Sequence, residues 1–256
     1  MKSLSIDVLT DRSSTAQLRA ASFPAVASRR RWLRALAALA TVVALLWFGR
    51  HLVLASAGRF LVAEDDLAPA DVIVASMAGM LANTLEAAHL FNEGVSTQIV
   101  LPTLASDPVA EEIRRLSRSG WSETEYGSWL LERCGVPKSA IQTLPGVVDG
   151  TDSEISAVVT FTRQHNLRSV LYITARSHTA RARRLLRNQL PRGTHLIMRS
   201  PRTDPFAAES WWHNRQQSRE VAGEYLRWVN TFVLGDLWAD RSRSTTGASA
   251  DRARQG

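Results

Sequence analysis

The feature that most constrains this chain is an apolar segment near the N-terminus, directly preceded by a cluster of arginines. Four arginines lie within residues 29–34, and an uncharged run follows from residue 35 to residue 49. A run of that length rises only about 22 Å as a helix, short of the ~30 Å hydrocarbon core of a bilayer. When the residues up to Gly58 are included, the segment is long enough to cross the core, provided that the side chains of Arg50 and His51 extend to the far interface. The sequence therefore predicts a transmembrane helix over residues 35–58.

The same arginine cluster predicts the orientation of the helix. Positive residues gather before the helix and not after it, which places the N-terminus in the cytoplasm. One alternative is a twin-arginine export signal at residues 28–34, with Ala55-Ser56-Ala57 as its cleavage site. Another is a buried amphipathic helix of a soluble protein, although the run lacks a polar stripe. The anchor and the export signal both place the following domain outside the cytoplasm.

The net charge of +7 is carried by the two ends of the chain. Residues 1–60 contain nine Lys/Arg and two Asp/Glu, and residues 239–256 contain four Arg and two Asp. The part between them has 18 basic and 20 acidic residues and is close to neutral. Because binding to a phosphate backbone needs a basic face on the folded domain, we expect no nucleic-acid partner. The single cysteine, Cys134, excludes an intrachain disulfide and a multi-cysteine zinc site.

Short apolar runs alternate with helical patterns between residues 71 and 234. Strands are expected at 71–75, 98–101, 141–144, 169–174 and 194–199, and helices at 81–93, 108–118, 123–134, 151–165, 177–190 and 215–234. Apolar strands separated by helices are typical of a parallel sheet covered on both faces. We therefore expect a Rossmann-like α/β domain over residues 59–238. A disordered N-terminus (1–34) and the helix (35–58) would precede it, and a flexible tail (239–256) would follow.

Loops that follow strands in such a sheet meet at its carboxyl edge, where ligands bind. The loop at 76–80 has a single glycine, whereas a phosphate cradle needs several. In the loop at 150–154, Glu154 follows Thr151 by three residues, a spacing that also fits a capping box with no catalytic role.

His178 and Arg181 follow the next apolar run and share the first turn of a helix. Backbone N–H groups and the helix dipole favour an anion at that position. A hydrogen-bonded structural role for His178 is the alternative. The sequence contains no His-x-x-x-His pair or Asp-rich loop, so no metal site is predicted.

Taken in order, these segments resemble the SanA/ElyC/YdcF-type envelope proteins. Residues 59–74 resemble the opening of that family, and residues 87–101 its first helix and second strand. Its two best-marked motifs resemble residues 150–154 and 173–182, and its closing segment resembles Trp212 with residues 224–227. The resemblance covers about residues 59–235. It implies a single-pass protein of the bacterial inner (plasma) membrane that serves cell-envelope or peptidoglycan-precursor homeostasis.

The resemblance also implies a set of site residues. Glu154 and His178 correspond to acid–base candidates, and Thr151, Thr174 and Arg181 to ligand-binding residues, for an anionic, phosphorylated envelope metabolite. The sequence departs from the family pattern at the turns 76–80 and 101–103 and at positions 83–84. These departures favour a non-catalytic scaffold as the alternative, and one branch of the resemblance suggests a nucleotide-type ligand such as S-adenosylmethionine. No cofactor is identified by the sequence.

Overall fold

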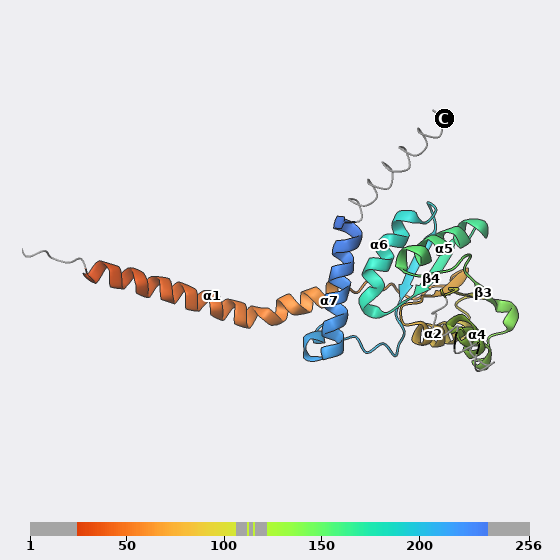
Figure 1. The fold of residues 1–256 in the computed structure, drawn as a ribbon, viewed down its shortest axis with the longest axis horizontal. Coiled ribbons are helices and arrows are strands. Elements are labelled where there is room, and N and C mark those ends of the chain that lie inside the picture. Colours follow the sequence, from red (N-terminus) through yellow and green to blue (C-terminus); the bar gives the residue numbers. More distant parts are fainter. Residues whose placement is uncertain (1–24, 106–111, 113–114, 116–121, 235–256) are drawn as a thin grey trace, which may run out of the picture. The chain divides into compact units, whose positions relative to one another are not determined.

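The computed structural model describes residues 25–105, 112, 115 and 122–234 and divides the chain into two units, residues 1–50 and 51–256. The predictions for the two ends of the chain, and most of the helix expected at 108–118, lie outside the described residues. Helix α1 runs from Ala25 to Phe60, and its part from Arg30 is long and apolar enough to cross a membrane (Figure 1). The helix expected at residues 35–58 is present and is longer at both ends.

The second unit contains a five-stranded parallel sheet with the order β3-β2-β1-β4-β5. The strands are β1 Val72–Ala75, β2 Ile99–Leu101, β3 Ile141–Thr143, β4 Ser169–Ile173 and β5 His195–Arg199. All five lie where the apolar runs predicted them. The chain fills one side of β1 with β2 and β3 and then crosses to the other side to form β4. This reversal makes the carboxyl edge of β1 and β4 the natural place for a ligand crevice.

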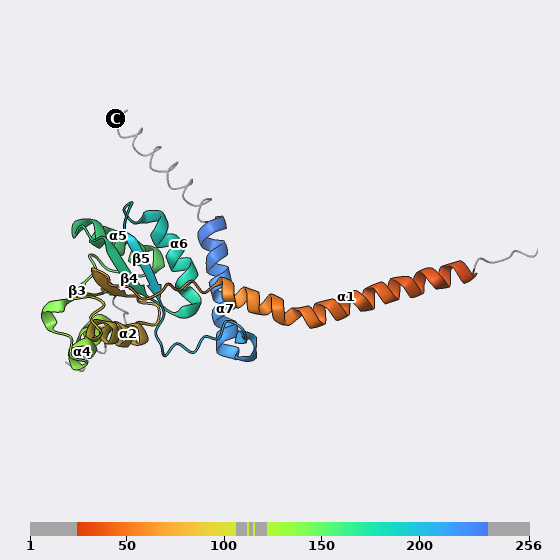
Figure 2. The same cartoon turned by 180° about the vertical axis from the view of Figure 1, so that it is seen from behind.

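Helices cover both faces of this sheet, which confirms the predicted α/β class (Figure 2). Helices α2 (Met80–Asn92) and α4 (Glu123–Arg133) pack against Ile73, Leu171 and Ile197. Helices α5 (Thr151–Gln164) and α6 (Thr179–Gln189) pack against Val74 and Tyr172 on the opposite face. Successive strand residues alternate between the faces, because side chains in a strand point to opposite sides in turn. Each fully buried aliphatic side chain contributes about 1.5–3 kcal/mol relative to an exposed one.

A third cluster joins the closing helix to the rest of the unit. Helix α7 (Arg215–Val229) begins at Asn214, whose side chain accepts hydrogen bonds from the N–H groups of Gln216 and Gln217. Its inner face buries Val221 against Leu61 and Phe206. Three short helical turns, η2 (Arg176–His178), η3 (Trp211–His213) and η4 (Asn230–Leu234), flank α6 and α7, and η1 (Lys138–Ala140) precedes β3.

Candidate functional site

Two strand-to-helix loops meet at the carboxyl edge of β1 and β4. The N–H of Ser76 donates to the carbonyl of Ile173 at 2.9 Å, and the N–H of Ala175 donates to the carbonyl of Ala78 at 3.3 Å. Gly79 closes the first loop with a left-handed backbone (φ 85°), a conformation that glycine adopts at little cost. The loops therefore hold each other at the point where the strand order reverses.

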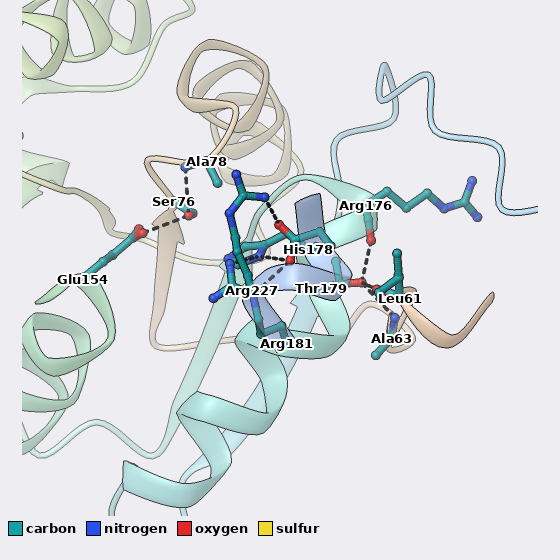
Figure 3. Close-up of polar contacts among 11 residues, drawn as sticks. Leu61, Ala63, Ser76, Ala78, Glu154, Arg176, His178, Thr179, Arg181 and Arg227 are labelled. Carbon is teal, nitrogen blue, oxygen red and sulfur yellow. Dashed lines mark hydrogen bonds and ion pairs between the residues drawn. The ribbon is translucent and has the colours of Figure 1, made fainter. Parts of the chain in front are cut away.

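Glu154 projects from the first turn of α5 toward the first of these loops and is almost fully buried. Its carboxylate accepts a hydrogen bond from the Ser76 hydroxyl at 3.1 Å (Figure 3). It accepts another from the Met77 N–H at 3.0 Å. Burial raises the pKa of Glu154 to about 7, against the lowering effect of these hydrogen bonds. A carboxyl group with this pKa can take up or release a proton at neutral pH.

The capping box that the spacing of Thr151 and Glu154 allows does not form in the structure. Thr151 is the first residue inside α5, and the preceding Gly150 occupies the N-cap position. The hydroxyl of Ser153 accepts the hydrogen bond from the Gly150 N–H, at 3.1 Å. Glu154 is thereby left free to bind the β1–α2 loop, because the local N–H groups are satisfied by another side chain. Thr151 itself lies half-buried at the start of the helix.

His178 and Arg181 lie together, and a residue not predicted for the site joins them. His178 Nδ1 lies 3.2 Å from Glu224 Oε2, and Arg181 Nε donates to the same oxygen at 2.9 Å. Arg227 Nη1 donates to the other oxygen of Glu224 at 2.9 Å. Burial acts to raise the pKa of Glu224, but His178 and Arg181 outweigh it and bring the pKa to about 2. The pair of Arg181 and Glu224 is therefore ionised and buried, with α7 supplying the negative charge.

The two ring nitrogens of His178 differ in their hydrogen bonding. Nδ1 lies within hydrogen-bond distance of both Glu224 Oε2 and Arg181 Nη2, the latter at 3.0 Å. A hydrogen on Nδ1 donates to Glu224 and leaves Nε2 as an acceptor, whereas the other tautomer leaves Nε2–H as a donor. Among the described residues Nε2 is buried and has no hydrogen-bond partner. In either tautomer His178 has unused capacity at Nε2.

Tyr172 lies in β4, the strand that leads to the loop of His178 and Arg181. Its fully buried hydroxyl has a pKa above the usual range, raised first by burial and then by the charge of Glu154 and lowered by the charge of Arg181. The hydroxyl is close to Ser76, yet it makes no hydrogen bond of good geometry within the described chain.

Thr174 adds another unsatisfied group at the end of β4. Its side chain is fully buried, and Oγ1 has no partner among the described residues. Tyr172 Oη, Thr174 Oγ1 and His178 Nε2 are thus three buried polar atoms without partners in one region. Each such atom costs about 1–3 kcal/mol when no partner is supplied. Native proteins satisfy nearly all buried polar groups with a protein, water or ligand partner.

A cavity of about 830 Å³ lies between the β1–α2 loop with the start of α2 and the start of α4. Its described lining is largely apolar and comprises Met77, Gly79, Met80, Leu81, Ala82, Ser122, Glu123 and Tyr126. Met77 links the cavity to the buried cluster, because its N–H binds Glu154. Glu154 and His178 are not among these lining residues. Within the described ranges, no group of three or more His, Cys, Asp or Glu side chains could hold a metal ion.

Sequence reasoning did not identify Ser76, Tyr172 or Glu224 as site residues. Glu224 lies within the segment 224–227 on which the family resemblance partly rests, and that position is the signal that could have identified it. Searches against protein-family models and against curated protein sequences give no match to this chain. The resemblance to envelope proteins therefore stays a prediction, and a function has to be inferred from the geometry of the cluster.

Proposed function

We propose that this chain is a membrane-anchored protein of the bacterial cell envelope that binds an anionic, phosphorylated ligand at the carboxyl edge of β1 and β4. The apolar helix supports the anchor, and the arginine cluster before it supports a domain outside the cytoplasm. The envelope assignment rests on the family resemblance. The binding assignment rests on the three unpartnered buried atoms of Tyr172, Thr174 and His178.

The charges around these atoms favour an anion. Arg181 and Arg227 share a single carboxylate, that of Glu224, so the group carries one excess positive charge. Glu154 compensates for this charge only in part, because its pKa near 7 leaves about half of the molecules protonated at neutral pH. Helix α6 also begins here, at Thr179, and the positive end of its dipole adds to the attraction.

Two groups at the site suit proton transfer on a bound ligand. Glu224 orients the imidazole of His178, and Nε2 is then the atom that accepts a proton from a ligand hydroxyl or a water molecule. Glu154 in its protonated form is the matching donor, because its pKa lies near the working pH. Hydrolysis or transfer of a phosphorylated group is the reaction class that this pair supports.

The test is to isolate the full chain in mild detergent and to identify co-purifying small molecules by mass spectrometry. We expect an anionic ligand on the unchanged protein and its loss in His178→Ala and Glu154→Gln. Loss of a polar contact to a buried charge costs about 2–5 kcal/mol, which lowers affinity by about 30-fold or more. His195→Ala, at the exposed start of β5, is the control.

Two outcomes would contradict the proposal. One is an anionic ligand retained equally by all variants, which would place the binding site elsewhere on the chain. The other is the absence of any ligand, combined with no change in the melting temperature on addition of inorganic phosphate or pyrophosphate. That second result would favour the non-catalytic scaffold.

A further inference from the structure

Helix α7 has an exposed apolar stripe on the face that points away from the core. Val221 and Glu224 are buried on the inner face, whereas Ala222, Leu226 and Val229 lie on the outer face at helical spacing. Leu226 is 71% exposed and Val229 49% exposed. Exposed basic side chains accompany this stripe, namely Arg215, Arg219 and Arg227. Apolar residues bordered by arginines on one helix are typical of helices that lie in a membrane interface.

The last turns of α1 pack on α7 and η3 within the same unit. Trp211 Nε1 donates to the carbonyl of Leu54 at 2.8 Å, and the Tyr225 hydroxyl donates to the carbonyl of Ala57 at 2.9 Å. The ring of Phe60 lies 6.1 Å from that of Tyr225 and 5.1 Å from that of Trp228. Phe60 is nevertheless 54% exposed, so the apolar surface of α7 continues onto the end of α1.

The depth of these contacts relative to a membrane depends on where along α1 the hydrocarbon core ends. Leu54 and Ala57 follow Arg50 by about 6 and 10 Å along the helix axis. The headgroup layer extends about 5–8 Å beyond the hydrocarbon core on each side. If the core ends near Arg50, then Trp211 and Tyr225 contact α1 within or just beyond the headgroup layer. If the apolar span continues to Gly58, the contacts lie deeper. In membrane proteins, Trp and Tyr are enriched at the membrane–water interface, at the level of the headgroups.

We propose that the α/β domain docks on the bilayer through a defined surface, here named the docking face. It comprises Phe60, Leu226 and Val229, bordered by Arg215, Arg219 and Arg227. This inference rests on the membrane anchoring proposed above, and it commits to a bilayer containing anionic lipids. Because the chain is tethered by α1, weak contacts suffice to keep the docking face in place. The arginines add attraction to anionic headgroups.

Docking has a consequence for the candidate site. Glu224, which binds His178 and Arg181, lies on the inner face of the helix whose outer face bears Leu226 and Val229. A helix with its side chains is about 10–12 Å across. The buried cluster is then held about one helix diameter from the headgroups, within reach of an anionic ligand that is itself bound to the membrane.

The experiment uses the full chain in nanodiscs of phosphatidylethanolamine and phosphatidylglycerol. Nitroxide labels are placed at Leu226→Cys or Val229→Cys, with Cys134 replaced by Ser, or by Ala if the Ser variant does not fold. The matched control is Val147→Cys, an apolar residue that is 64% exposed before α5. We expect lipid-soluble oxygen to relax the labels at 226 and 229 more than a water-soluble nickel complex does, and the reverse at 147.

The possible outcomes separate this inference from the anchoring on which it rests. A chain that fails to co-elute with the nanodiscs would refute the anchor itself. A chain that co-elutes, but whose labels at 226 and 229 respond to nickel as the label at 147 does, would refute only the docking face. Labels shielded from both reagents would indicate burial against protein, and this result too would overturn the proposal.

Discussion

Replacing Glu154 by Gln should make the protein more stable at alkaline pH, even though Glu154 is a buried hydrogen-bonded residue. Gln has nearly the same shape, and its oxygen can still accept the hydrogen bond from the Met77 N–H. The substitution removes only the ability of the side chain to ionise. A buried carboxyl group that must ionise lowers the free energy of unfolding, whereas a neutral amide does not.

The size of the effect follows from the pKa of Glu154. Burial raises it from the ordinary value of 4.5 to about 7. Below pH 4.5 the carboxyl is protonated in the folded and the unfolded chain, so its contribution to stability is fully present. As the pH rises from 4.5 through 7, the unfolded chain ionises first and that contribution is lost. The loss amounts to about 3 kcal/mol, at 1.36 kcal/mol per pH unit.

The assay is the melting temperature of the detergent-solubilised full chain between pH 5 and pH 8.5, in buffers free of phosphate. For a domain of this size about 3 kcal/mol corresponds to about 6–12 °C. Between pH 5 and pH 8.5 the melting temperature of Glu154→Gln should rise by that much relative to that of the unchanged protein. The melting curve of Glu132→Gln, on the exposed side of α4, should stay parallel to that of the unchanged protein. Parallel curves for Glu154→Gln as well would show that Glu154 is ionised throughout, and the reasoning would fail.

Three further predictions follow from other parts of the chain. Glu224→Ala should lower the free energy of unfolding by about 3–5 kcal/mol in denaturant titrations, because it leaves Arg181 buried without a counter-charge; a loss below 1 kcal/mol would contradict this. Gly58→Ala should destabilise by about 1–3 kcal/mol, since the new Cβ would lie 2.1 Å from the carbonyl oxygen of Ala208; Gly150→Ala, with open space around it, should be nearly neutral by the same measurement. A reporter that is active only in the cytoplasm should be silent when fused to the C-terminus, and a strong signal would refute the proposed orientation.

The sheet could be predicted because its information is local. Four of the five strands are short runs dominated by apolar residues, the exception being β3 (Ile141–Thr143), and each strand lies within a residue or two of its expected bounds. Asp71 shows why the bounds shift. It was expected to open the first strand, but its carboxylate accepts hydrogen bonds from the N–H groups of Arg168 and Ser169, at 2.6 and 2.8 Å. Asp71 therefore ties the beginning of β4 to the residue before β1, and β1 starts at Val72.

The site could be predicted only in part, because its contacts join distant segments. His178 and Arg181 were identified through helical spacing and the family resemblance, but their partner Glu224 lies 46 residues beyond His178 and leaves no local pattern. Tyr172 is inconspicuous inside an apolar strand. The spacing of Thr151 and Glu154 fits a local cap, but in the structure Ser153 satisfies the Gly150 N–H and Glu154 binds the β1–α2 loop. Only the fold distinguishes between them.

Glu224 changes the interpretation of Arg181. The sequence predicts that Arg181 holds an anion directly, but in the structure its Nε and the oxygen of Glu224 already form a buried ion pair. In the proposed function, an anion would therefore be attracted by the excess charge of the whole group, including the half-exposed Arg227, and not by Arg181 alone. Because Glu224 belongs to α7, the charge at the ligand edge depends on the position of that helix. If α7 lies on the bilayer, its docking also fixes the electrostatic state of the site.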